Sequence, residues 1–101
     1  MTLRIGILGA ARVATYALID AARAVDGVMV QAVAARDPAR ARAYADQHGL
    51  ARAYPDYQAL IDADDVDAVY VALPPSLHAR WSIAALAAGK PVLCEKPFAL
   101  T

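Results

Sequence analysis

The sequence predicts an α/β fold, in which one parallel β-sheet carries helices on both of its faces. Short runs of mostly apolar, β-branched residues are spaced along the chain, and segments with helical spacing of apolar residues separate most of them. A turn containing glycine joins the first run to the first helical segment. This alternation is typical of a doubly wound sheet, because each helical connection returns the chain to the same end of the sheet.

The apolar runs define the expected strands. Most of them lack the strict apolar–polar alternation of a half-exposed strand, so burial on both faces is expected. The strand segments are residues 3–8, 28–35, 51–54, 66–73 and 91–94. Arg4 is the single charged residue of the first run, near its start.

The first two helices have recognisable ends. Alanine and valine recur at helical spacing from Arg12 to about Val25, and Asp26-Gly27 ends this segment. The second helix starts at Pro38 with Asp37 as its N-cap, because a proline at the first helical position loses no hydrogen bond. It runs to His48, and Gly49 supplies the left-handed cap.

Two further helices follow the third and fourth strands. Asp56 is expected to cap a brief helix that continues through Ile61. Pro74-Pro75 breaks the fourth strand, and Ser76 can cap the next helix, which Gly89 ends. One face of that helix is apolar and comprises Leu77, Trp81, Ala84, Ala85 and Ala88.

Length and composition indicate one domain, residues 1–101, and exclude several classes of function. The ten basic and ten acidic residues cancel, so no overall charge favours nucleic acid or an anionic membrane. A lone cysteine, Cys94, indicates a reducing compartment, and no run of about 20 apolar residues could span a bilayer. We therefore expect a cytoplasmic protein. No Cys/His cluster, P-loop or nucleophile elbow is present, and no metal site is predicted.

The turn after the first strand fits a dinucleotide-binding fingerprint with substitutions. Aligned to G-x-G-x-x-G/A, its three positions are Gly9, Ala11 and Ala14. Gly9 permits the tight turn, whereas the methyl group of Ala11 moves a pyrophosphate slightly outward. The N-terminus of the following helix offers unpaired N–H groups, and the expected contacts are Gly9, Ala10, Ala11, Arg12 and Val13. A tight turn that binds nothing is the alternative.

The end of the second strand favours NADP over NAD. Ala35 occupies the position at which NAD-preferring domains place an acidic residue for the ribose diol. Arg36, with Arg40 one turn later, could instead form charge-assisted bonds to a 2′-phosphate. Solvated surface charge is the alternative for both arginines. Asp37 is a competing ribose ligand, although its place before Pro38 favours capping.

Polar residues also follow the fourth and fifth strands. His78 lies in the first turn of a helix, where a histidine is more often a structural hydrogen-bonding residue than a catalyst. Glu95 and Lys96 stand together at the end of an apolar strand, followed by Pro97. A lysine held there could polarise a carbonyl or lower the pKa of a substrate hydroxyl. A surface ion pair is the alternative. Tyr70 and Trp81 are expected in the core.

Four segments together resemble one family. GILGAARVA, AVAARDP, VDAVYVALPPSLH and AGKPVLCEKPFAL are similar, in order, to the glucose–fructose oxidoreductase/inositol dehydrogenase (Gfo/Idh/MocA) family, most of all to its dihydrodiol and xylose dehydrogenases. The resemblance covers the whole chain and implies a Rossmann-like fold. It implies NAD(P)-dependent hydride transfer on a sugar, polyol or cyclic diol. Ala11, Ala35 and Pro75 depart from the family pattern.

The resemblance also implies roles for named residues. Lys96 becomes the active-site lysine of the E-K-P motif, with Glu95 near the nicotinamide and Pro97 as a conformational anchor. The residues implied to line the cofactor groove are Leu73, Pro74 and His78. Family members continue into a substrate-binding and dimerisation domain that is absent from this chain, so we expect a sheet that is incomplete at its C-terminal end and a homo-oligomeric parent protein.

Two other functions remain open on the sequence. A chain without a substrate domain could be a non-catalytic dinucleotide-binding or assembly module. A glycosidase that oxidises its substrate transiently with tightly bound NAD is compatible with the related fold. An NADP-preferring dehydrogenase is the hypothesis that the motifs favour.

Overall fold

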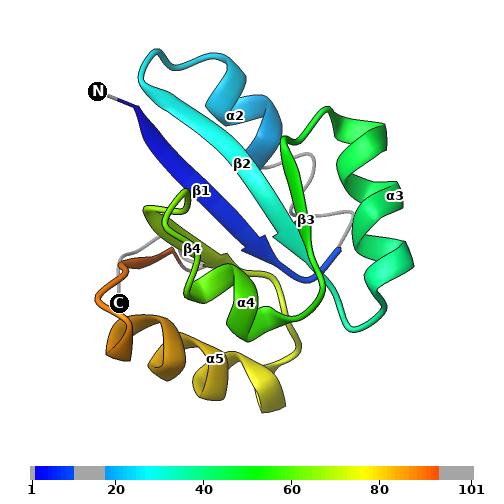
Figure 1. The fold of residues 1–101 in the computed structure, drawn as a ribbon. Coiled ribbons are helices and arrows are strands. Elements are labelled where there is room, and N and C mark those ends of the chain that lie inside the picture. The colour runs from blue at the N-terminus through cyan, green and yellow to red at the C-terminus, as the bar shows by residue number, and fades with distance from the viewer. Residues whose placement is uncertain (1, 11–17, 94–101) are drawn as a thin grey trace.

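The computed structural model describes residues 2–10 and 18–93 of the chain (Figure 1). Five strands and four helices lie in these two ranges. In chain order they are β1 (Leu3–Leu8), α2 (Asp20–Arg23), β2 (Val28–Ala34), α3 (Pro38–His48), β3 (Arg52–Tyr54), α4 (Tyr57–Ile61), β4 (Ala68–Val71), α5 (Pro75–Ala87) and β5 (Val92–Leu93). The strands and helices alternate, as the sequence predicts.

The five strands form one parallel sheet in the order β3-β2-β1-β4-β5. The chain builds outward from β1 to β3 on one side, and then crosses to β4 and β5 on the other. This order confirms the doubly wound sheet. The direction of winding reverses between β1 and β4, and the crevice at the carboxyl ends of such strands is where ligands bind in open α/β sheets.

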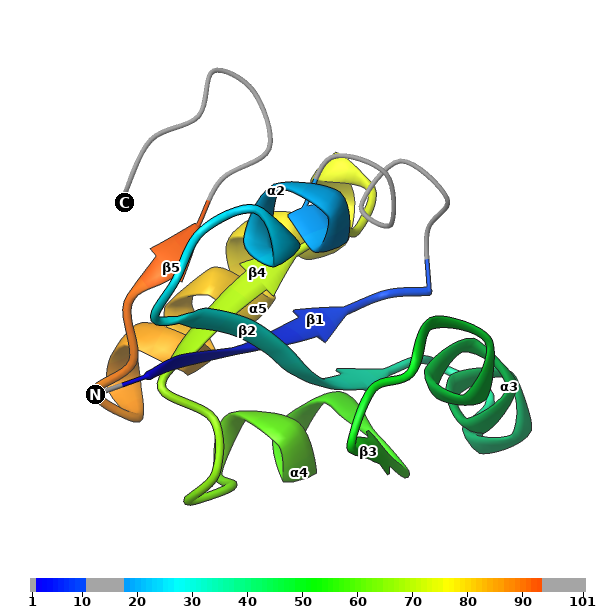
Figure 2. The ribbon, with the colours of Figure 1, turned by 90° about the horizontal axis from the view of Figure 1, so that it is seen from above.

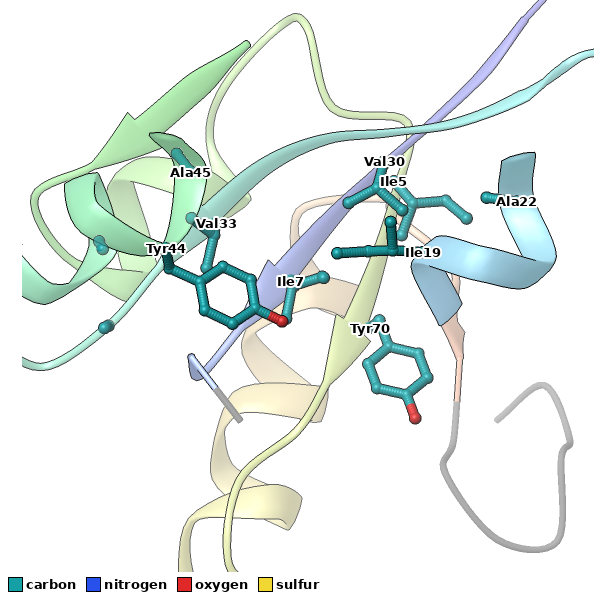
Figure 3. Packing of buried hydrophobic residues seen from close by; sticks show 11 residues of the cluster. Ile5, Ile7, Ile19, Ala22, Val30, Val33, Tyr44, Ala45 and Tyr70 are labelled. Carbon is teal, nitrogen blue, oxygen red and sulfur yellow. The ribbon is translucent and has the colours of Figure 1, made fainter. Parts of the chain in front are cut away.

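Helices cover both faces of the sheet, and Figure 2 shows α2 and α4 on opposite sides of β1 and β2. Successive residues of β4 show the alternation of a strand buried on both faces: Tyr70 belongs to one apolar cluster, and Val69 and Val71 to the other. The first cluster lies under α2 and α3 (Figure 3), and the second lies under α4 and α5. The sheet therefore separates two cores.

The predicted helix caps are confirmed where the sequence signal is local. The Asp37 carboxylate accepts a hydrogen bond from the Ala39 N–H at 2.9 Å, and α3 ends at Gly49 with a φ of 69°. Asp56 caps α4 through the Ala59 N–H at 2.7 Å. Each of these caps satisfies backbone groups that have no partner inside the helix.

The first helix ends earlier than the sequence predicts. Its described part, α2, stops at Arg23, and residues 11–17 lie outside the described ranges. The N–H groups of Ala24 and Val25 bond to carbonyls three residues back, each at 3.2 Å, which tightens and closes the final turn. Val25 consequently lies outside the helix and is 54% exposed, so the prediction that the helix continues to about Val25 is wrong.

The fourth strand and the helix after it also differ from the prediction. The strand is shorter than residues 66–73, because the Val66 N–H turns back to the Ala63 carbonyl and regular pairing begins only at Ala68. Ser76 is not the N-cap of α5. The Pro74 carbonyl accepts the N–H groups of both Leu77 and His78 at 2.9 Å, so the helix begins at Pro75 with Ser76 already inside its first turn.

Smaller differences occur at other element ends. Residues 35, 51 and 91 flank strands rather than belonging to them, and Cys94 lies outside the described residues. Ala88 is exposed at the C-cap of α5 instead of lying on the apolar face of that helix. None of these differences changes the sheet order or the position of the candidate site.

Candidate functional site

Backbone hydrogen bonds tie together the segments at the carboxyl ends of three adjacent strands. The Gly9 N–H donates to the Ala34 carbonyl at 2.8 Å, which joins the turn after β1 to the end of β2. The Ala72 N–H donates to the Leu8 carbonyl at 2.9 Å, which joins the segment after β4 to the end of β1. These backbone hydrogen bonds therefore form the floor of the ligand site that the topology predicts at this edge of the sheet.

Gly9 is required at this floor for two independent reasons. Its φ is 100°, a conformation that residues with a Cβ rarely adopt. A Cβ at this position would lie 2.5 Å from the Ala72 carbonyl oxygen and 3.0 Å from the Leu73 Cδ2. The tight turn that the sequence predicts at Gly9 is present, and the strand-end segments can meet only because no side chain stands between them.

Besides Gly9, three of the predicted cofactor residues lie at the two strand ends that meet here. Ala10 follows Gly9 and packs against the first apolar cluster, whereas Leu73 packs against the second. Pro74 follows Leu73, is exposed, and begins α5 as its N-cap. The remaining residues predicted for this region lie outside the described ranges: Ala11, Arg12, Val13, Glu95, Lys96 and Pro97.

The two predicted phosphate-binding arginines lie at the surface. Arg36 follows β2 at the same edge of the sheet, and Arg40 lies one turn into α3. Both are exposed, and within the described ranges neither forms a salt bridge. Ala35, by contrast, is 5% exposed and belongs to the first cluster. Among the residues that the structure describes, the positive charge at this strand end therefore has no carboxylate partner.

Sequence reasoning missed Tyr57, the first residue of α4. Its ring meets that of Trp81 edge to face, with the ring centroids 5.2 Å apart and the planes at 76°. The Arg80 guanidinium carbon lies over the Trp81 ring, 5.0 Å from its centroid. Burial raises the pKa of the Tyr57 phenol, and the positive charge of Arg36 partly opposes that rise.

The two aromatic residues expected in the core differ in burial. Tyr70 is 1% exposed in the first cluster, as predicted. Trp81 is only partly buried against the second cluster, where it supports Tyr57. A signal for Tyr57 existed in the sequence, because in a parallel sheet the segment after β3 begins at the same edge as the segment after β2. Strand order was needed to use it.

His78 has a structural partner. Its Nδ1 lies 3.3 Å from the hydroxyl oxygen of Ser82, one turn further along α5. Ser82 is 9% exposed, so this contact ties the half-buried imidazole to its own helix. The structural hydrogen bond anticipated for this histidine is present, and a role in lining a cofactor groove stays a prediction.

Comparison with known proteins identifies the family. Residues 3–101 match the model of the GFO_IDH_MocA oxidoreductase family with an NAD-binding Rossmann fold. The chain is 48% identical over 99 residues to a dTDP-3,4-didehydro-2,6-dideoxy-alpha-D-glucose 3-reductase of Streptomyces antibioticus, covering 98% of this chain and 30% of that protein. It is 48% identical over 92 residues to the D-xylose 1-dehydrogenase (NADP(+)) 2 of Haloferax volcanii, covering 91% and 28%.

Solved structures agree with this family. The crystal structure of KijD10, a 3-ketoreductase from Actinomadura kijaniata in complex with NADP and TDP-benzene, superposes with a TM-score of 0.87 and 42% identity. The match covers 96% of this chain and 30% of that one. The chain thus spans less than a third of the length of these relatives. With the strand order, the glycine turn and the family match together, the chain belongs to the Gfo/Idh/MocA oxidoreductase family and forms its NAD-binding Rossmann fold.

Proposed function

We propose that this chain is the nucleotide-binding part of an NADP-dependent oxidoreductase that acts on a CH–OH group of a sugar, polyol or cyclic diol. The observation that carries the proposal is the close approach of Gly9 to the segment after β4, with Arg36 following the neighbouring strand β2. Relatives named as an NADP-dependent xylose dehydrogenase and as a dTDP-sugar reductase support the cofactor and the substrate class.

The residues of the crevice suit a dinucleotide. In this proposal the pyrophosphate lies against the turn formed by Gly9, Ala10, Ala11, Arg12 and Val13, where a helix N-terminus favours negative charge. Arg36 and Arg40 bind the 2′-phosphate, because guanidinium groups form charge-assisted bonds to phosphate oxygens. Leu73, Pro74 and His78 line the groove on the side of β4.

The chemistry proposed for the chain is proton handling beside the nicotinamide. When bound, NADP⁺ would accept the hydride in the oxidation, and NADPH would supply it in the reduction. Lys96 holds a proton at the substrate oxygen, so that the C–O group changes oxidation state without leaving an unstabilised alkoxide. In this proposal Pro97 anchors the conformation of the lysine, and Glu95 lies near the nicotinamide. Assembly into homo-oligomers and location in the cytoplasm are parts of the same proposal.

Nucleotide binding is tested by titrating the purified protein with NADPH and NADH and following nicotinamide fluorescence. We expect tighter binding of NADPH and a loss of about tenfold to a hundredfold in NADPH affinity on Arg36→Ala, the range for one hydrogen-bonded charge. Arg42→Ala is the matched control, because Arg42 is also an exposed arginine of α3 but points away from the direction of Arg40. Binding of neither cofactor by a folded protein would contradict the proposal.

The reaction is tested in the longer protein that contains this chain. Lys96→Ala is expected to abolish turnover of sugar and polyol substrates while NADPH affinity changes little, because the lysine acts on the substrate oxygen. Retention of full turnover would remove Lys96 from the mechanism. Absence of turnover in the unchanged protein, with NADPH still bound, would instead favour a non-catalytic binding module.

A further inference from the structure

Ser82 is the one buried residue with a polar, non-aromatic side chain in the part of the chain that the structure describes. It lies within α5, and only 9% of its surface is exposed. Alanine would be the better helix former at this position, because a serine side chain competes with the helix for backbone hydrogen bonds. Helix propensity and apolar packing therefore do not explain the hydroxyl group, and its hydrogen-bond partner indicates what it does.

That partner is His78, one helical turn before Ser82. The Ser82 hydroxyl oxygen lies 3.3 Å from Nδ1 of the imidazole. His78, Ser82 and Ala85 recur at helical spacing on one face of α5, and Ala85 is fully buried in the second apolar cluster. The half-buried imidazole therefore lies where this sheet-facing side of α5 begins, just after the carboxyl end of β4. Because Ser82 occupies Nδ1, Nε2 is the ring nitrogen that remains for a ligand.

The strand order indicates which part of a dinucleotide His78 would meet. In the proposed function Arg36, after β2, binds the 2′-phosphate, and the turn at Gly9, after β1, binds the pyrophosphate. Since β1 lies between β2 and β4, the segment after β4 meets the half of the dinucleotide that is farther from the 2′-phosphate. That half carries the nicotinamide and is identical in NADPH and NADH. A residue that acts through His78 should therefore affect both cofactors alike.

We infer that Ser82 is a positioning residue that holds the His78 imidazole through Nδ1, so that Nε2 meets the nicotinamide half of the bound dinucleotide. The inference rests on the proposed function, because it assigns the means by which His78 is fixed in the cofactor groove. An imidazole without such a partner rotates about its side-chain bonds, and ordering it on binding lowers the affinity. The Ser82 hydroxyl group orders the ring before the cofactor binds.

The test measures the dissociation constants of NADPH and NADH for variants of the purified protein. Ser82→Ala is expected to weaken the binding of both cofactors about twofold to tenfold, the effect of one side chain no longer ordered before binding, and to leave their ratio unchanged. Ser76→Ala is the matched control, because Ser76 is an exposed serine of the same helix on a different face from His78. It should change neither constant. Circular dichroism verifies that both variants are folded, which is expected because alanine favours helix.

Two further measurements separate positioning from a merely structural role. In a His78→Ala background, Ser82→Ala should have no further effect on either affinity, because the residue that it positions is gone. The ring ¹⁵N chemical shifts of the two histidines give the second measurement: Ser82→Ala should move the Nδ1 shift of His78 and leave those of His48 unchanged.

The outcomes distinguish this inference from the proposed function. If the unchanged protein binds neither NADPH nor NADH, the proposed function itself is wrong, and the inference fails with it. If the protein binds both cofactors but Ser82→Ala leaves both affinities unchanged, only the positioning role is overturned. An equal loss from Ser82→Ala with and without His78 would also overturn it, because Ser82 would then act through packing.

Discussion

Three glycine-to-alanine substitutions separate the two reasons for which Gly9 is needed at the candidate site. Gly49 shares its positive φ, at 69°, but a Cβ there would meet no atom within 4 Å. Gly6 has the crowding without that conformation, because its Cβ would lie 2.7 Å from the Leu60 Cδ2. Gly9 combines a φ of 100° with a Cβ 2.5 Å from the Ala72 carbonyl oxygen. The set therefore separates conformational strain from steric overlap.

The expected losses in the free energy of unfolding follow from these contacts. Gly49→Ala should cost about 1–2 kcal/mol, the strain of a left-handed conformation in a residue with a Cβ. Gly6→Ala should cost about 1–3 kcal/mol, the usual range for overpacking a buried site. Gly9→Ala should cost roughly 2–5 kcal/mol, because both effects act together and the atom that it meets belongs to the backbone.

Urea unfolding, followed by circular dichroism at equal protein concentration, measures the free energy of unfolding of all three variants. A loss of this size for Gly9→Ala is a large fraction of the roughly 5–15 kcal/mol that stabilises a domain. If Gly9→Ala were no more destabilising than Gly49→Ala, the segments after β1 and β4 would not approach each other as the structure shows. NADPH affinity of the folded Gly9→Ala protein should also fall, since relieving the overlap moves the floor of the crevice.

Two further predictions concern the opposite, amino-terminal side of the molecule. The Arg4 guanidinium, 3.0 Å from Asp67, and the Arg4 backbone N–H lower the pKa of the Asp67 carboxyl from 3.8 to about 2. The ionised Asp67 carboxylate therefore stabilises the fold above pH 3.8, and this stabilisation is lost as the pH falls toward 2. Asp67→Asn should flatten that part of the curve of unfolding free energy against pH. An unchanged slope would contradict this explanation. Asp65 accepts hydrogen bonds from Tyr54 and Gln31. Asp65→Ala should therefore lower the free energy of unfolding by about 1–3 kcal/mol. Burial and the hydrogen bond to Asp65 raise the pKa of Tyr54 to about 12, so the same substitution should lower that pKa in an ultraviolet titration. A phenol that still titrates near 12 would show that burial alone raises its pKa.

Features with a local cause were predicted from the sequence. The strand β1 has the predicted bounds, because a short apolar run needs only to be buried on both faces. The caps at Asp37, Asp56 and Gly49 were predicted because each hydrogen bond or backbone angle involves residues only a few positions apart. The ends of other elements were less predictable, because pairing with a distant strand decides where a strand stops. The strand from residue 66 shows this.

The candidate site divides in the same way. Gly9 and Arg36 could be named from the sequence, because a turn glycine and the residue after the second strand have fixed places in an α/β unit. That the Ala72 carbonyl lies against Gly9, and that the Tyr57 ring meets that of Trp81, follows only from the strand order. Contacts of this kind join segments tens of residues apart, and no local pattern encodes which segments will meet.

The sequence by itself thus determined the class of fold, the caps and the type of residue at each strand end, because these depend on the period of apolar residues and on short-range hydrogen bonds. The tertiary structure alone decided which strand ends meet at the candidate site and which backbone carbonyl lies against Gly9. The physical reason is that the burial of two cores, one on each face of the sheet, selects a single strand order, and that order brings distant side chains together.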